Sequence, residues 1–396
     1  MTAPSLSRME EAAERVGLAG VFRKVVDEQR LSGDDGAALY RCDDINLLGG
    51  MANLVRERRS GRLAYFVRNQ HINYTNICNK DCDFCAFYVR AKDPSGYVLS
   101  PEDVRRRVTE QIDEPVTEIH MVAGINPRLP YDYYLDIVRA VKETRPAVTV
   151  KAFTMIELEE IARVARKPRE AVLEELKAAG LGSLPGGGAE VLSDRVHAEI
   201  FPKKLTPAEW LGWARSAHLA GLRSNCTMLY GHIETVEERV EHLLKVRELQ
   251  DETGGFLTFI PLAFHPDNTE MSHLPPTTGM LDLKQIAVAR LMLDNFDHVK
   301  SFWIMVTLAI TQLTLWYGAD DIDGTILREE ITHAAGAVTP QALTHREMIA
   351  MIREAGREPV ERDALYNVIW RDTPQAPAGG NGRDARPVVA AGGAGA

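Results

Sequence analysis

The chain has 396 residues, with 46 basic and 56 acidic side chains and a formal net charge of −10. This length and a hydrophobic content of 45% predict a globular protein with a sizeable core, built as one large α/β barrel or two ordinary domains. The acidic balance argues against a protein that binds the phosphates of nucleic acids.

No segment of the sequence predicts export or insertion into a membrane. The stretch up to Gly17 is polar and charged, without the apolar core of a secretory signal. The most apolar window, residues 301–316, is shorter than the roughly 20 residues that span a bilayer, and Gln312 interrupts it. Five cysteines, an odd number, favour a reducing compartment and a use in metal binding or catalysis. We therefore expect a cytoplasmic protein.

The first sixty residues have the apolar spacing of helices. The pattern predicts one helix from Met9 to Gln29 and a second from Asp43 to Ser60. A short apolar strand is expected at residues 63–67.

From His71 onward, strand-like and helical segments alternate. The expected strands are residues 71–75, 118–123, 148–153, 181–184, 224–230, 256–264, 302–306 and 320–323. Ser100, Thr206 and Thr235 open capping boxes at the starts of helices, and Gly180 and Gly221 mark helix ends. Eight repeats in about 250 residues predict a closed (β/α)₈ barrel of the TIM type. A doubly wound open sheet is the alternative.

The chain is predicted to end in a helix and a tail. The helix follows a capping box at Thr344 and is expected outside the barrel as a C-terminal helical extension. The tail is rich in Pro, Gly and Ala and is predicted to be disordered. The predicted organisation is an N-terminal helical region (1–62), the barrel with its C-terminal helix (63–371) and the tail (372–396).

Three of the five cysteines lie in one short loop. Cys78, Cys82 and Cys85 form the pattern C-x₃-C-x₂-C directly after the first barrel strand, and the loops that follow barrel strands form the catalytic face. A structural zinc site needs four ligands, usually in two separated pairs, and no second C-x-x-C occurs. A catalytic zinc site is an alternative that lacks a nearby Glu or His ligand. Three thiolates can instead hold three corners of a [4Fe–4S] cube, leaving one iron open to a substrate-like ligand.

The other two cysteines are not expected to be ligands. Cys42 is isolated among the N-terminal helices, and Cys226 lies inside the fifth strand, where a small apolar residue fits the core.

The loop CNKDCDFC, with the aromatic Phe84 before its last cysteine, resembles the signature of the radical S-adenosylmethionine superfamily. The resemblance implies a TIM-type barrel, a [4Fe–4S] cluster on Cys78, Cys82 and Cys85, and S-adenosylmethionine chelated to the open iron. It also implies that one electron cleaves the sulfonium and yields a 5′-deoxyadenosyl radical. Phe84 is then expected beside the adenine.

Further stretches are similar to the aminofutalosine synthase family of the futalosine route to menaquinone, among them HINYTNIC, LPGGGAE, FIPLAFHPDNT and GADDIDGT. This resemblance implies addition of the radical to the enolpyruvyl double bond of 3-[(1-carboxyvinyl)oxy]benzoate, giving 6-amino-6-deoxyfutalosine. It also implies a low-potential electron donor such as flavodoxin or ferredoxin.

Three alternatives stay open. The cyclic dehypoxanthinylfutalosine synthase family of the same route shares the cysteine loop and GGGAE, although PLAFHP and GADDIDGT favour the first family. An iron–sulfur or zinc protein for binding or electron transfer is an alternative from another class. A metal-dependent hydrolase is a third, but such enzymes use His and Asp ligands.

The resemblance also implies contacts at the barrel mouth. Gly124 and Asn126 are expected at the methionine end of S-adenosylmethionine, and Glu190, after the glycines 186–188, at its ribose or ammonium group. Asp320 at the last strand is a further candidate for cofactor binding. His265, after the sixth strand, is the candidate catalytic residue, which could bind a substrate carboxylate or move a proton. For each, a purely structural role is the alternative.

The sequence differs from the family pattern at two places, and the first barrel strand has an alternating polar pattern. Ala123 precedes Gly124 where Gly-Gly is expected, and residues 305–312 replace a stretch expected to contain Gly-Pro. His71, Asn73 and Thr75 alternate along the first strand and are expected to point into the barrel beneath the cluster.

Overall fold

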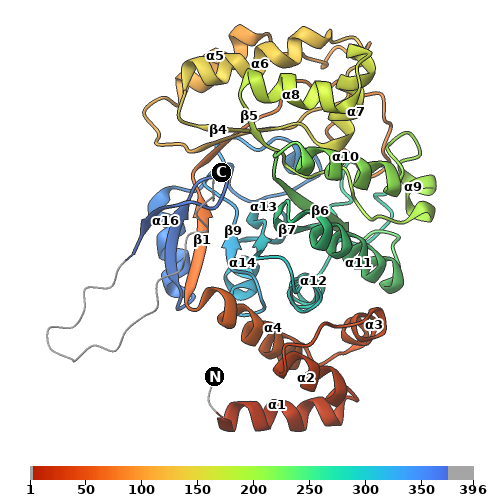
Figure 1. Cartoon of the computed structure of the whole chain (residues 1–396), viewed down its shortest axis with the longest axis vertical. Coiled ribbons are helices and arrows are strands. Elements are labelled where there is room, and N and C mark those ends of the chain that lie inside the picture. Colours follow the sequence, from red (N-terminus) through yellow and green to blue (C-terminus); the bar gives the residue numbers. More distant parts are fainter. Residues whose placement is uncertain (1–2, 373–396) are drawn as a thin grey trace, which may run out of the picture.

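The computed structural model describes residues 3–372, so the predicted tail from residue 373 onward lies outside the described residues. Four helices precede the barrel and lie at the bottom of Figure 1. They are α1 (Ala3–Arg15), α2 (Ala19–Val26), α3 (Gly33–Arg41) and α4 (Ile45–Ser60). The single helix predicted from Met9 to Gln29 is wrong, because Gly17, at a φ of 75°, takes the left-handed conformation and separates α1 from α2.

Eight parallel strands within residues 3–372 enclose the barrel. They are β2 (Asn69–Ile72), β3 (Glu118–Met121), β4 (Thr149–Ala152), β5 (Leu181–Ser183), β6 (Ser224–Tyr230), β7 (Phe256–Ala263), β8 (His298–Ser301) and β9 (Asp321–Ile322). They form two runs of paired strands, β2 to β5 and β6 to β9. Single bridges close the ring between Leu184 and Ser224 and between Gln70 and Leu327. The predicted (β/α)₈ barrel is confirmed.

Helices surround the barrel (Figure 1). They are α5 (Pro101–Glu110), α6 (Tyr131–Thr144), α7 (Met155–Ala165), α8 (Arg169–Ala179), α9 (Asp194–Ile200), α10 (Pro207–Leu219), α11 (Val236–Thr253) and α12 (Gly279–Met292). Both hydrogen bonds of the predicted capping boxes form at Ser100, Thr206 and Thr235. Gly180 ends α8 in the left-handed conformation. Local chemistry therefore defines many of these boundaries.

The seventh barrel strand is not where the sequence predicted it. Residues 302–306 are not a strand, since Trp303–Val306 forms α13, followed by α14 (Leu308–Thr314). A short apolar run fits a buried helix as well as a buried strand, and Trp303 and Ile304 pack in a separate apolar cluster. The true strand, β8, reads His-Val-Lys-Ser and places the buried Lys300 against Asp323. Its polar residues concealed it from an apolar pattern.

The C-terminal extension is only partly helical, which corrects the prediction. After α15 (Ile331–Ala334) and α16 (His345–Glu354), the chain adds β10 (Glu358–Arg362) and β11 (Val368–Arg371). β10 runs parallel to β1 (Leu63–Val67), outside the barrel ring. Its charged residues form ion pairs, including Arg362 with Asp321 at 2.5 Å, so its sequence lacks the alternation of an ordinary strand. No helix within residues 3–372 has the length and apolar character needed to cross a bilayer.

Candidate active site

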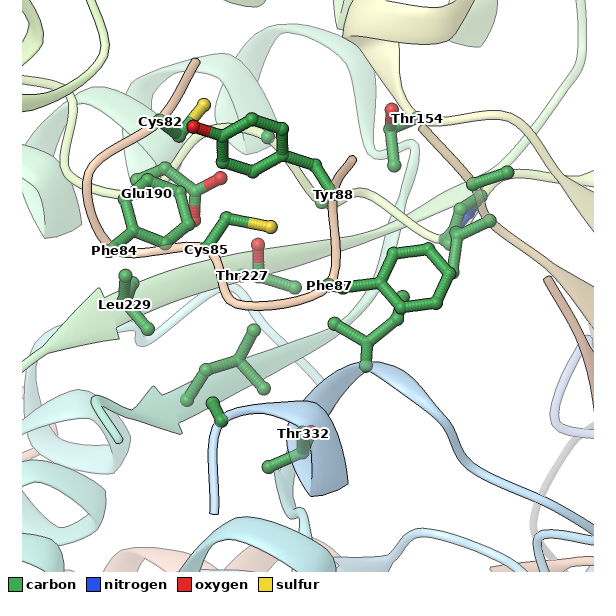
Figure 2. Close-up of a pocket in the computed structure, with 18 of the residues that line it drawn as sticks. Cys82, Phe84, Cys85, Phe87, Tyr88, Thr154, Glu190, Thr227, Leu229 and Thr332 are labelled. Carbon is green, nitrogen blue, oxygen red and sulfur yellow. The ribbon is translucent and has the colours of Figure 1, made fainter. Parts of the chain in front are cut away.

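A cavity of about 320 Å³ lies at the carboxyl end of the barrel. Its lining residues come from all eight strands, either near their carboxyl ends or from the segments that follow them. In Figure 2 the loop carrying Cys82 to Tyr88 bends around one side of this cavity, and the Cys85 sulfur points into the space that the loop encloses.

Backbone hydrogen bonds hold the cysteine loop against its neighbours. Asn79 N–H donates to the carbonyl of Ile125, and Asp83 N–H donates to that of Ile200, both at 3.0 Å. Gly124 is required for this packing, since a Cβ there would lie 2.4 Å from the carbonyl oxygen of Ile77. The predicted methionine-end residue Gly124 therefore also has a structural role beside the cysteines.

The three cysteines of the loop line the same cavity. Burial raises the pKa of the Cys82 thiol to about 12, although the positive charge of Lys204 opposes this shift. Burial also raises the pKa of Cys85, against hydrogen bonds to its sulfur from the backbone N–H groups of Phe87 and Tyr88. Thiols in this setting lose their protons readily only when a metal takes the proton's place.

The donor set fits a cluster better than a single ion. Within residues 3–372, no three His, Cys, Asp or Glu side chains are arranged to hold one metal ion. An iron–sulfur cube differs, because each thiolate binds a separate iron. Cys42 and Cys226 do not line the cavity, and all five cysteines are free thiols.

Phe84 and Glu190, two of the predicted cofactor contacts, line the cavity together with a buried lysine. Lys204 Nζ lies 2.5 Å from a Glu190 carboxylate oxygen and 4.8 Å from the centroid of the Phe84 ring. No sequence motif indicated Lys204 as a cavity residue. Nothing in FPKKL distinguishes it from Lys203, whose side chain is 57% exposed against 12% for Lys204.

Two of the predicted cofactor residues lie outside the cavity lining. Asn126 is buried, and its side-chain oxygen accepts the N–H of Arg128 in a turn. Asp320 lies just before β9, at the amino end of the barrel, where it pairs with Arg290 at 2.5 Å and His298 at 2.8 Å. Asp323, beyond the carboxyl end of β9, lines the cavity instead. Neither Asn126 nor Asp320 therefore faces this cavity, since one strand end or turn position decides which way a side chain faces.

Glu157 is a second cavity residue that no sequence motif indicated. Its carboxylate accepts the hydroxyl of Tyr74 at 2.6 Å, the N–H of Thr154 at 2.7 Å and the backbone N–H of Ala123. Burial raises the pKa of Glu157 to about 7. Ala123, which stands where the family is expected to have glycine, lines the cavity, and the hydrogen bond from its backbone N–H to Glu157 holds it in place.

His265 also lines the cavity, and one of its ring nitrogens is already engaged. Nε2 lies 2.9 Å from the carbonyl oxygen of Met305. Because a carbonyl only accepts, we assign the proton to Nε2, which leaves a lone pair on Nδ1. Phe302 lines the cavity as well, and so does Met305, so the divergent stretch at residues 305–312 contributes to the lining.

The barrel and a cysteine loop at its catalytic end define a radical S-adenosylmethionine enzyme. Residues 72–246 match the radical SAM superfamily, and residues 253–376 match the CofH/MqnC C-terminal region. The crystal structure of methylornithine synthase shares the fold at a TM-score of 0.69 and 15% identity, covering 85% of this chain and 96% of that one.

The relatives narrow the class further. Aminodeoxyfutalosine synthase from Thermus thermophilus is 47% identical over 89% of this chain and 96% of its own length. The Streptomyces coelicolor protein of that name is 40% identical over 88% and 92%. A cyclic dehypoxanthine futalosine synthase from Halalkalibacterium halodurans is 36% identical over 89% and 95%. The chain belongs to the aminodeoxyfutalosine synthase family of radical SAM enzymes, as the sequence motifs predicted.

Proposed function

We propose that the chain transfers the 5′-deoxyadenosyl group of S-adenosylmethionine to 3-[(1-carboxyvinyl)oxy]benzoate in menaquinone biosynthesis. With water, the products are 6-amino-6-deoxyfutalosine, methionine and bicarbonate. The identity of 47% over 96% of the Thermus enzyme carries this proposal. The cysteine-lined cavity gives it a place in the molecule.

The cysteine end of the cavity is the proposed site of the cofactors. Cys78, Cys82 and Cys85 are the proposed ligands of the [4Fe–4S] cluster that the superfamily uses, which supplies the single electron for cleavage of S-adenosylmethionine. Phe84 is the proposed contact of the adenine. Glu190, held by Lys204, is the proposed acceptor of hydrogen bonds from the ribose or ammonium group.

The apolar wall of the cavity, from β7 and the segment after β8, suits an aromatic substrate. Ile260, Leu262, Phe302 and Met305 present apolar surface to the cavity. Such a surface packs against a benzene ring and excludes water from a reactive radical. His265 is the proposed catalytic residue, since its Nδ1 lone pair can accept a proton within this wall.

The reductant and the location belong to the same proposal. A flavodoxin or ferredoxin is the proposed partner, because cleavage of the sulfonium needs a low-potential electron. A cytoplasmic location agrees with five free cysteines, which suit a reducing compartment.

Anaerobic reconstitution followed by a product assay tests the proposal. The protein is supplied with iron, sulfide, reductant, S-adenosylmethionine and the enolpyruvyl benzoate. The expected result is a brown protein with about four irons per chain and an adduct that carries the adenosine and the aryl group. Free 5′-deoxyadenosine as the main product would favour the cyclase, and a colourless zinc protein would favour a different class.

A further inference from the structure

Two stacked histidines form the polar floor of the cavity, below the cysteine loop. His71 on β2 and His120 on β3 are paired in register, and their ring centroids lie 4.5 Å apart. Both line the cavity. They belong to the strands themselves, whereas the cysteines lie in the loop that follows β2, so the cavity extends from that loop into the barrel.

His71 presents a hydrogen-bond donor to the cavity. Asn69 Oδ1 accepts the backbone N–H of Ile326 at 3.0 Å, which fixes the orientation of the amide and directs its NH₂ group toward His71 Nε2 at 3.3 Å. Nε2 is therefore an acceptor, and we assign the ring proton to Nδ1. Burial lowers the pKa of His71 to about 3, so this ring is neutral. Nδ1 has no hydrogen-bond partner among residues 3–372.

His120 is held from behind by a buried carboxylate. Its Nδ1 lies 3.6 Å from Glu118 Oε1, and the other oxygen of Glu118 lies 2.6 Å from Lys151 Nζ. Against burial, Lys151 holds the pKa of Glu118 well below its usual range, so Glu118 is ionised. Within the described residues, Nε2 of His120 has no partner.

The fixed charges of the floor are balanced without the histidines. Lys151 is opposite Glu118, and Lys300 Nζ lies 3.4 Å from Asp323 Oδ1. A carboxylate bound here would therefore add an uncompensated negative charge. An imidazole can supply the missing positive charge by taking up a proton near neutral pH.

The geometry points to a carboxylate subsite on this floor, which resolves how one end of the proposed substrate is held. We infer that the ring carboxylate of 3-[(1-carboxyvinyl)oxy]benzoate accepts hydrogen bonds from His71 Nδ1 and His120 Nε2. His120 becomes an imidazolium between this carboxylate and Glu118. The inference rests on the proposed function, and it makes both histidines determinants of substrate specificity.

The shape of the substrate decides which of its two carboxylates reaches the floor. The enolpyruvyl carboxylate is attached next to the vinyl carbon that is attacked, so it stays near the cysteine end. The ring carboxylate is at the opposite end of the molecule. His265 is a poorer partner for it, because its unengaged nitrogen carries a lone pair instead of a proton.

A chemical double-mutant cycle tests this assignment. One axis replaces the substrate by 1-carboxyvinyl phenyl ether, which lacks only the ring carboxylate. The other axis is His71→Phe or His120→Phe, each of which keeps a flat ring. In the wild type, loss of the ring carboxylate should raise KM about a hundredfold, and in either variant by less than about fivefold. If the ratio of the two KM values, without and with the ring carboxylate, is the same in the variants as in the wild type, the proposed subsite is wrong.

Two further variants test whether the change in KM ratio comes from the N–H donors of the cavity histidines. His345→Gln changes a histidine of α16 outside the cavity and should leave the ratio unchanged. His71→Gln retains an N–H donor and should restore part of the discrimination. If the wild type forms no adduct from the full substrate, the proposed function fails; if it forms adduct and the ratios do not change, only the subsite fails.

Proton uptake by the wild type tests the same claim without a variant. Calorimetry of the substrate binding to the reconstituted, oxidised protein at pH 8, in buffers of different ionisation enthalpy, gives the number of protons taken up. Binding of the substrate should take up close to one proton, and binding of the carboxylate-free ether close to none. Equal uptake with both ligands contradicts an imidazolium at His120.

Discussion

The two ends of the barrel differ in how their buried polar groups are satisfied. At the amino end, Asp320 accepts hydrogen bonds from Arg290, His298 and Ser60, and Arg56 donates to three backbone carbonyls. At the carboxyl end, His71, His120 and His265 each present a ring nitrogen without a partner among residues 3–372. Fully satisfied networks rigidify a core, whereas unpaired groups beside a cavity are available to a ligand. We therefore assign stability to the amino end and chemistry to the carboxyl end.

Removing a cysteine of the loop should have the largest effect on the chemical end. Cys78→Ala, Cys82→Ala or Cys85→Ala should each reduce turnover by about a thousandfold or more, because the cluster would lose one of its three proposed protein ligands. Iron content and adduct formation after anaerobic reconstitution measure the effect. Cys226→Ala is the matched control, since this buried thiol lies in β6 outside the cavity. It should retain activity and lose only about 1 kcal/mol of stability.

Neutralising Asp320 should have the largest effect on the structural end. Asp320→Asn leaves the guanidinium of Arg290 buried beside a neutral group, and we expect a loss of about 3–5 kcal/mol in the free energy of unfolding. Urea denaturation measures this loss, while activity per folded molecule should stay near that of the wild type. Asp297→Asn is the control, because the Asp297 side chain is exposed and its ion pair with Arg59 is 3.7 Å long. An equal loss of unfolding free energy in the two variants would show that the buried network of Asp320 does not contribute more to stability than an exposed ion pair.

The same carboxylate predicts a dependence of stability on pH. Against burial, Arg290 and His298 hold the pKa of Asp320 well below its usual range. The stability that it contributes is therefore complete above the pKa of an unfolded aspartate, about 4, and is lost as the pH falls toward the lower folded pKa. Between pH 5 and pH 3, the free energy of unfolding should fall less steeply in Asp320→Asn than in the wild type.

A methyl group at Gly124 should disturb the cysteine loop by an intermediate amount. Gly124→Ala would place a Cβ 2.4 Å from the Ile77 carbonyl oxygen, so the loop must move. We expect a loss of about 1–3 kcal/mol of stability and lower iron loading, measured by denaturation and by iron analysis. Gly20→Ala in α2 meets no atom within 4 Å and should be neutral or slightly stabilising. Normal iron loading in Gly124→Ala would show that the loop tolerates the displacement.

Removing the charge of Lys204 should have the smallest effect on the chemical end. Lys204→Met takes a buried positive charge from beside Cys82 and Cys85, so adding an electron to the cluster becomes harder. We expect the reduction potential to fall by about 30–60 mV in a spectroscopic redox titration. Lys203→Met, at an exposed neighbour paired with Asp81, is the control and should leave the potential unchanged. An equal reduction potential in the two variants would show that the charge of Lys204 does not influence the cluster.

The sequence located elements best where the signal is local. The capping boxes at Ser100, Thr206 and Thr235 formed as predicted, because a cap joins residues three positions apart. The strand β8 was misplaced because its lysine is stabilised by Asp323, a partner 23 positions away. The same reason hid β10, whose Arg362 pairs with Asp321.

The sequence by itself determined the alternation that builds a barrel and the cysteine spacing that marks its chemical end, since both depend on near neighbours along the chain. Only the tertiary structure brought Lys204 beside Glu190, set His120 against His71 and showed that Asp323, not Asp320, faces the cavity. Closure of the ring brings such residues together from distant segments. Which of them face the cavity depends on strand register and on where each strand ends, and neither is written in any one segment.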